Sequence, residues 1–210
     1  MPRPGKSDLS ARGNRYHHGD LRAALIDTAI ELIGERGVRG FSMAEASRRL
    51  GVAVSAPYAH FADRDDLLAA VAVRAFELLG SSLVPQSEAH TDPADRLAGM
   101  ARAYVRFAAT KRPLFEVLYE PGLDKARYPE IEAAERPVTD AFEACVRALS
   151  GGEGPHADDL AFALEATAHG HAMLLLSDGG PGLDDGATEL IAERAARATR
   201  ALLAGHQMLG

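Results

Sequence analysis

The stretch of sequence that decides the fold lies near the N-terminus and reads Ser42-Met-Ala-Glu-Ala-Ser-Arg-Arg-Leu-Gly51-Val-Ala-Val-Ser-Ala-Pro-Tyr-Ala-His-Phe61. Ser42 followed by Glu45 forms a capping box, which predicts the start of a short helix, and Gly51 predicts its end. A second short helix follows almost at once. Two helices joined so closely can cross only where the first is small and the turn tolerates a positive φ. Ser47 and Gly51 meet these needs, so the pattern indicates a helix-turn-helix.

In a helix-turn-helix the second helix lies in the major groove of DNA. Its first residues would face base edges, in a mostly apolar surface suited to thymine methyl groups, and later polar residues would reach phosphates. Pro57 has no N–H, so this helix is expected to start late and to be short. The predicted DNA contacts, including one from a basic N-terminal arm, are Arg15, Ser42, Val54, Ser55, Ala56, Tyr58, His60 and Arg64. A purely structural corner between two helices fits the same spacing and stays open.

Helical patterns continue through the rest of the chain, and strand-like alternation is missing. Caps and breaks predict helices over about 21–36, 43–50, 54–60, 63–80, 93–110, 113–121, 129–149, 156–177 and 185–204. The expected fold class is all-α, with a flexible basic arm (1–18), a three-helix DNA-binding domain with the helix-turn-helix (19–66) and a helical ligand-binding and dimerisation domain (67–210).

The charge of the 210 residues is unevenly divided. The net charge is −7, but residues 1–74 carry +2 and residues 75–210 carry −9. A basic arm and a near-neutral head on an acidic body suit a protein that meets DNA through its head alone, although chance charges on a solvated tail explain the arm equally well. No apolar run approaches the roughly 18 residues that a membrane span needs, and no secretion signal is visible. The single cysteine fits a reducing cytoplasm, so we expect a cytoplasmic protein.

Residues 15–80 resemble the DNA-binding domain of the TetR family of transcriptional regulators. The resemblance is carried by an Ala-rich first helix, Phe41-Ser42, Leu50-Gly51-Val52 and the block Tyr58-x-His60-Phe61-x-x-Arg64-Asp65-x-Leu67-Leu68. It implies that Tyr58, His60 and Arg64 clasp the operator backbone, with Arg64 where the family usually has Lys. The family often caps its recognition helix with Ser at the position of Ala53, so Ser55 is expected to cap instead.

The resemblance also implies a homodimer that binds a palindromic operator, most often as a repressor, and that a small-molecule effector releases. The segment Ala168-His169-Gly170-His171 is similar to a TetR subgroup named for a Trp-His-Gly motif, although Glu165 stands where the tryptophan belongs. The dimer contacts expected on the last two helices are Leu160, Leu164, Ala168, Leu175, Leu190, Ala198 and Leu202. The effector contacts expected among the middle helices are Tyr104, Phe107, Leu118, Tyr119, Phe142, His169 and Met173. Each of these residues could instead belong to the ordinary core of one subunit.

The sequence lacks the motifs that are typical of an enzyme. His169 and His171 are two residues apart and point to opposite sides of a helix, so they cannot hold one ion together. The metal, nucleotide and nucleophile motifs H-E-x-x-H, P-loop, G-x-G-x-x-G and G-x-S-x-G are absent, and Cys145 has no evident histidine partner. We therefore expect no catalysis, cofactor or metal. A DNA-binding dimer without an effector, architectural or controlled by a protein, remains an alternative.

Overall fold

A computed structural model describes residues 20–120, 123–178 and 184–209, and every regular element in these ranges is helical. In chain order the elements are α1 (Leu21–Gly40), α2 (Met43–Leu50), the 3-10 helix η1 (Ala56–Ala59), α3 (Arg64–Glu88), α4 (Pro93–Thr110), α5 (Arg112–Leu118), α6 (Pro129–Ser150), α7 (Pro155–Asp178) and α8 (Asp185–Leu209). The predicted all-α fold is confirmed. The predicted arm, with Arg15, lies outside the described residues.

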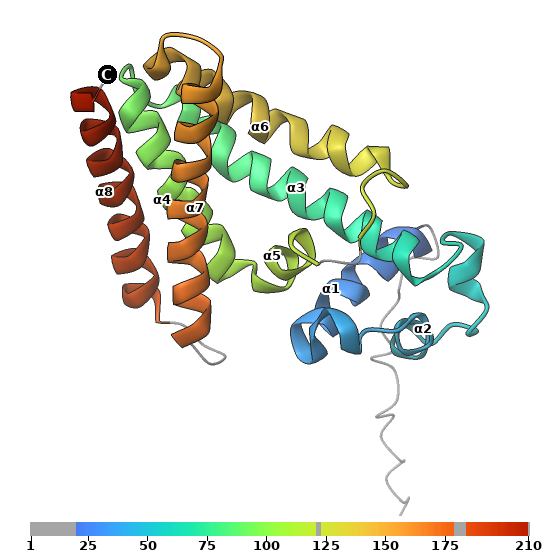
Figure 1. Cartoon of the computed structure of the whole chain (residues 1–210). Coiled ribbons are helices and arrows are strands. Elements are labelled where there is room, and N and C mark those ends of the chain that lie inside the picture. The colour runs from blue at the N-terminus through green and yellow to red at the C-terminus, as the bar shows by residue number, and fades with distance from the viewer. Residues whose placement is uncertain (1–19, 121–122, 179–183, 210) are drawn as a thin grey trace, which may run out of the picture.

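Helix α3 connects the two ends of the molecule (Figure 1). Helices α1 and α2 with η1 form a head at one end, and α4, α7 and α8 pack together at the other. Helix α6 lies along α3, and α5 packs on α1, α3 and α4. The head packs on α3 and α5, so these two elements position it on the body.

Short polar residues start the helices as their positions predict. Asp20 and Asp63 each accept a hydrogen bond, at 2.9 Å, from the backbone N–H three residues on, and Asp92 accepts one at 2.9 Å from two residues on. Gly37 interrupts α1 with φ 71° and ψ 167°, and a last short turn then runs to Gly40. The predicted break is thus present, although the helix resumes after it.

Helix α3 is longer than the predicted span of 63–80. Gly80 does not end it, because the residue keeps a negative φ and faces α6, where an added Cβ would lie 3.6 Å from Val138. The helix continues through Pro85 to Glu88. Long-range packing on α6 thus overrides a local stop signal.

Of the described helices, α3 is the one long and apolar enough to cross a membrane by length and composition, with a mean hydropathy of 1.8 over 18 residues. Just over half of that stretch, 56%, is buried inside the protein. Its inner residues Leu67, Val71 and Ala75 are fully buried. The apolar character of α3 is that of a core helix.

One hydrophobic cluster extends from the head into the body. It includes Leu25 of α1, Leu67 of α3, Phe115 of α5 and Ala192 of α8. A second, smaller cluster joins α4, α6, α7 and α8 at the far end. The predicted boundary between residues 66 and 67 falls inside the first turn of α3, so the proposed domains share a helix and a core.

Candidate nucleic-acid interface

The turn between α2 and η1 has the geometry that its residues predict. The Ser42 hydroxyl accepts from the N–H of Glu45 at 3.2 Å and caps α2. Ser47 is fully buried, and its hydroxyl donates to the carbonyl one turn back at 3.0 Å. Gly51 has φ 69°, and the N–H of Val52 returns to the Ser47 carbonyl at 3.1 Å, which closes the helix end. The glycine is needed here because the left-handed conformation strains other residues.

Only half of the predicted capping box forms. In a full capping box the Glu45 carboxylate would also accept from the N–H of Ser42. This carboxylate does not turn back to the cap but binds the guanidinium groups of Arg48 and Arg36. These bonds lower the pKa of Glu45, and the Arg48 bond contributes most. Glu45 therefore ties α2 to α1.

The second helix of the motif is a single 3-10 turn, shorter than the predicted span of 54–60. Pro57 stands at its start and is buried. Since proline lacks an N–H and disfavours helical geometry in the residue before it, a longer α-helix is not formed here. The prediction that Ser55 caps this helix is wrong. Ser55 occupies the N-cap position with helical φ and ψ of −80° and −16°, and its side chain makes no capping hydrogen bond.

Large side chains project into solvent around this turn. Val54 is 59% exposed and Tyr58 is 55% exposed, whereas Phe61 is only 4% exposed and fills the small core beneath. Ser42, Ser55 and His60 are also exposed, and Ala56 is half-buried. The predicted reading residues thus lie at the surface around a rigid, buried Pro57, as a DNA-contacting edge requires.

Arg64 lies differently from the other predicted contacts. Its guanidinium donates to the carbonyls of Val38 at 2.6 Å and Phe41 at 3.3 Å, and lies over the Phe41 ring at 5.6 Å. Arg64 therefore joins the start of α3 to the link between α1 and α2. A contact of Arg64 with phosphate stays a prediction. In the structure this side chain binds backbone carbonyls within the head.

Two further cations of the head were not selected from the sequence. Arg48, at the end of α2, has a side chain that is 68% exposed. Arg22, at the start of α1, lies over the Phe61 ring at 5.3 Å. Arg48 stands three residues before the turn glycine Gly51, and Arg22 stands two residues after the cap Asp20. These positions beside the motif could have identified both arginines from the sequence.

Three of the seven predicted effector contacts meet in one place, which we call the tyrosine–histidine cluster: Tyr104, Tyr119 and His169. The hydroxyl of Tyr104 is hydrogen-bonded to that of Tyr119 and, at 2.9 Å, to His169 Nδ1. Phe115, which was not predicted, stacks on His169 at 5.8 Å. It stands four residues before Tyr119, so a shared helix face was the missed signal. Burial raises the pKa of Tyr104 above its ordinary value.

The other four predicted effector contacts do not join this cluster. Phe107 is 3% exposed and belongs to the main core, and Leu118 packs at its edge. Phe142 packs between the two hydrophobic clusters, and Met173 is 45% exposed. The structure places these four residues in the hydrophobic core or at the surface, and not around a common pocket.

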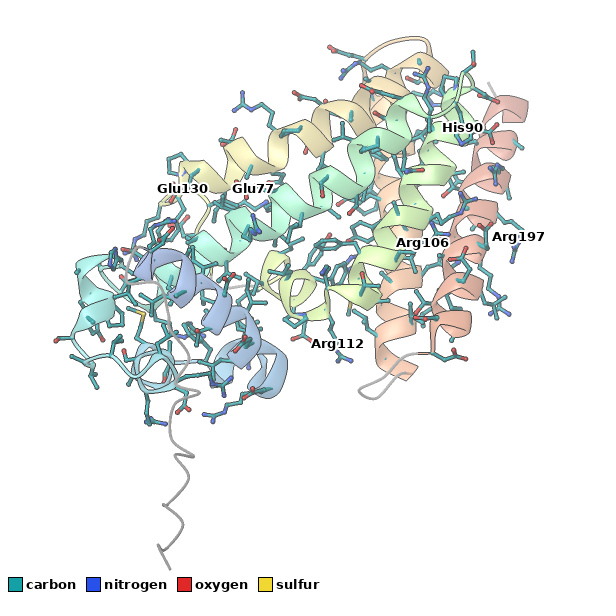
Figure 2. The ribbon with its side chains drawn as sticks, turned by 180° about the vertical axis from the view of Figure 1, so that it is seen from behind. Glu77, His90, Arg106, Arg112, Glu130 and Arg197 are labelled. Atoms are coloured by element: carbon teal, nitrogen blue, oxygen red, sulfur yellow. The ribbon has the colours of Figure 1, made fainter. Side chains whose placement is uncertain are left out.

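Two hollows lie elsewhere, along α3. The first, which we call the junction hollow, measures about 640 Å³ and lies between α1, the residues that follow η1, α3 and the start of α6. The second measures about 600 Å³ between α3 and α6. Both are lined by Val73, Glu77 and Glu130, and Figure 2 shows the two glutamates close together at the start of α6. None of the predicted effector residues lines either hollow.

Three of the seven predicted dimer contacts need correction, and the other four stay predictions. Leu160, Leu164 and Leu175 are at most 5% exposed and are buried in the core of their own subunit. Ala168, Ala198 and Leu202 are half-buried, and Leu190 is 50% exposed. The exposed apolar residues of α7 are others, namely Phe162 at 74%, Leu174 at 66% and Met173 at 45%. A helical stripe was identified correctly, but it packs inward.

The described residues contain no group of three or more histidine, cysteine, aspartate or glutamate side chains that could hold a metal ion. Cys145 is buried, and burial raises the pKa of its thiol, so it is a poor nucleophile.

Comparisons with known proteins agree with this arrangement. Residues 25–71 match the model for bacterial regulatory proteins of the tetR family, and residues 97–199 match a tetracyclin repressor-like C-terminal domain. The HTH-type transcriptional activator FasR of Mycolicibacterium smegmatis is 28% identical over 182 residues, which cover 85% of this chain and 82% of FasR. Assignment to the Trp-His-Gly subgroup stays a prediction.

Solved structures share the fold over nearly the whole chain. A Rhodococcus sp. RHA1 protein of unknown function is 30% identical, with a TM-score of 0.68, and the match covers 90% of this chain and 97% of that one. AibR, solved with isovaleryl coenzyme A and operator DNA, is 20% identical with a TM-score of 0.66, and the match covers 84% and 96% of the two chains. FadR of Bacillus halodurans, a fatty acid degradation regulator, is 13% identical with a TM-score of 0.68, covering 88% and 97%.

Proposed function

The chain belongs to the TetR family of bacterial transcriptional regulators, and from that premise we propose that it binds a palindromic operator as a homodimer and leaves it when a small-molecule effector binds. Regulators of this family bind DNA and are not enzymes. The proposal implies a cytoplasmic protein, because bacterial operators lie in the cytoplasm.

The observation that carries the proposal is the exposed rim around the buried Pro57. Val54 and Tyr58 each leave more than half of their surface in water. The methyl groups of Val54 suit thymine, and Ser55 can donate to or accept from a base edge. Tyr58 and His60 suit phosphate oxygens on either side. With so few polar readers, DNA shape and backbone contacts carry much of the recognition.

The proposed dimer places the outer faces of α7 and α8 against those of a second subunit. Phe162 and Leu174 of α7 and Leu190 of α8 are at least half exposed, which is an unfavourable state for such large apolar groups in a monomer. A symmetric pair of heads also matches a palindromic operator, whose half-sites lie about one helical turn apart.

For the effector we propose the tyrosine–histidine cluster as the polar part of the site. Two hydroxyls and an imidazole at one point can bind a carbonyl or carboxyl oxygen of a ligand. Isovaleryl coenzyme A is bound by AibR, so acyl thioesters are the first class to test.

Repression is the proposed outcome of operator binding. Activation is a second candidate, because the related FasR is named as an activator. A reporter placed behind the bound promoter separates the two: deletion of the regulator raises expression if it represses and lowers it if it activates.

The central experiment selects duplexes from a random-sequence library with the full-length protein. The proposal expects a palindromic consensus protected on two successive major grooves. Tyr58→Ala should weaken binding to the selected duplex, whereas Arg136→Ala, which alters an exposed ion pair on α6, should not. Enrichment of no duplex by the wild-type protein would refute DNA recognition.

Isovaleryl coenzyme A and a metabolite library are then added to the complex. If nothing releases the DNA or raises the melting temperature, the dimer without an effector is the better description.

A further inference from the structure

The turn that precedes α6 reaches back to the first turn of α3. Arg127 donates from Nη2 to Asp63 Oδ2 at 2.7 Å and to Asp66 Oδ1 at 3.1 Å. Tyr128 donates its hydroxyl proton to the same Asp66 oxygen at 2.9 Å. The Arg127 guanidinium also lies over the Tyr128 ring at 4.9 Å. We call these four residues the clamp.

Both carboxylates of the clamp also shape the backbone that follows η1. The second oxygen of Asp63 caps α3, and the second oxygen of Asp66 accepts from the N–H of Ala62 at 2.9 Å. Ala62 and Asp63 come directly after His60 and Phe61. Each aspartate therefore fixes local backbone with one oxygen, Asp63 the start of α3 and Asp66 the residue after Phe61, and binds the turn before α6 with the other.

The donors of the clamp are held firmly from their own side. Tyr128 is only 6% exposed, and its carbonyl accepts from Ile131 in the first turn of α6 at 3.0 Å. The N–H groups of Arg127 and Tyr128 return to Asp124 and Lys125, each at 3.1 Å. Lys125 in turn binds Glu135 of α6 at 2.6 Å. The turn is thus anchored on α6, so its position relative to α6 is fixed.

The junction hollow lies beside the clamp. Its lining includes His60 and Phe61 from the head side and Asp66 and Tyr128 from the clamp. Because about 640 Å³ is left open there, packing does not fix the head along this edge. The polar bonds of the clamp cross the edge instead, and they are directional, so they define an angle as well as a distance.

We propose that Arg127 and Tyr128 are positioning residues that set the angle of the DNA-binding head on the body, and with it the operator spacing that the dimer accepts. The proposal rests on the proposed function, because spacing has meaning only for two heads on one duplex. Neither residue needs to contact DNA.

The test uses the full-length protein and the duplex that the wild type selects. Affinity is measured for the optimal site, for sites with one or two base pairs inserted between the half-sites, and for an isolated half-site. Each inserted base pair turns one half-site by about 34° relative to the other, since a helical turn takes about 10.5 base pairs. A dimer with fixed heads should therefore lose affinity steeply along the series.

Arg127→Ala and Tyr128→Phe are the test variants, and the second keeps the buried ring. Both should bind the optimal site roughly fivefold more weakly, as the loss of about one hydrogen bond of ordinary net strength predicts, with a flatter spacing series and an unchanged half-site affinity. Arg136→Ala, which removes an exposed cation that is paired with Glu132 of the same helix, should behave as the wild type.

Two results would overturn the clamp. One is a spacing series as steep in both variants as in the wild type. The other is an equal loss on the half-site and the full site, which would mean that the head itself is damaged. If the wild type selects no duplex at all, the proposed function fails together with the clamp. If it selects DNA and only the spacing result is negative, the clamp alone fails.

Discussion

Two residues on one helix, Leu160 and Phe162, should respond to mutation in opposite ways. Leu160 is 3% exposed within one subunit, and Phe162 is 74% exposed. Leu160→Ala should lower the free energy of unfolding by about 2–5 kcal/mol, because a buried leucine leaves a cavity. Phe162→Ala should leave the folded subunit intact and weaken the dimer.

The size of the Phe162 effect follows from its exposed area. A phenylalanine side chain buries about 200 Å², so 74% exposure leaves roughly 150 Å² to be covered by a partner. At about 25 cal/mol per Å², and with part of the area retained by alanine, each copy contributes up to about 2.5 kcal/mol. Two copies in a symmetric interface give an upper limit of about 5 kcal/mol, or several thousandfold in the dimer dissociation constant.

Sedimentation at a series of concentrations measures the dissociation constant, and circular dichroism at 25 °C measures the fold of each variant. Tyr58→Ala is the matched control, since Tyr58 is an aromatic residue with 55% exposure on the head; its dimer should be unaffected. A Phe162→Ala dimer as tight as the wild type, or a wild-type protein that sediments as a monomer at micromolar concentration, would contradict the assignment of this face.

Three further predictions concern the head. Tyr58→Ala should weaken specific and random DNA alike, whereas Ser55→Ala should change the selected sequence, and an unaltered consensus would count against Ser55 as a reader. Arg64→Lys should lower the melting temperature as well as DNA affinity, because a single ammonium cannot reproduce the planar fork by which Nε and Nη2 of Arg64 each reach a backbone carbonyl; lost affinity at an unchanged melting temperature would show that only DNA contact matters. The Arg127 bond holds the pKa of Asp63 below its ordinary 3.8, so its contribution to stability is present at neutral pH and lost as the pH falls below about 3.8. Acid titration by NMR should find this pKa raised in Arg127→Ala, and an unshifted value would exclude the bond in solution.

The local features of the fold could be predicted because they depend on neighbours in sequence. Caps at Asp20, Ser42 and Asp63 need only a side chain and an N–H two or three residues on, and the left-handed turn at Gly51 needs only a glycine. Pro57 likewise forecast a late, short second helix.

The features that failed depend on contacts between distant residues. Periodicity identifies the apolar face of α7 but cannot tell whether that face meets α4 or a second subunit, so Leu160 was assigned to the wrong partner. The inward turn of Arg64 depends on carbonyls more than twenty residues away. The bonds of Arg127 join residues more than sixty positions apart, and nothing in the local sequence marks them.

The shared hydrophobic cluster limits how this regulator can be re-engineered. Leu25 and Leu32 of α1 belong to the same buried cluster as Leu67 and Val71 of α3. A chimera that joins a foreign head to this protein at residue 66 would place unrelated side chains against Leu67 and Val71 of α3. The buried cluster would then be poorly packed at the junction. The natural unit of exchange is the helix-turn-helix head together with α3, α5 and the turn before α6, because these are the elements on which the head packs or to which it is hydrogen-bonded.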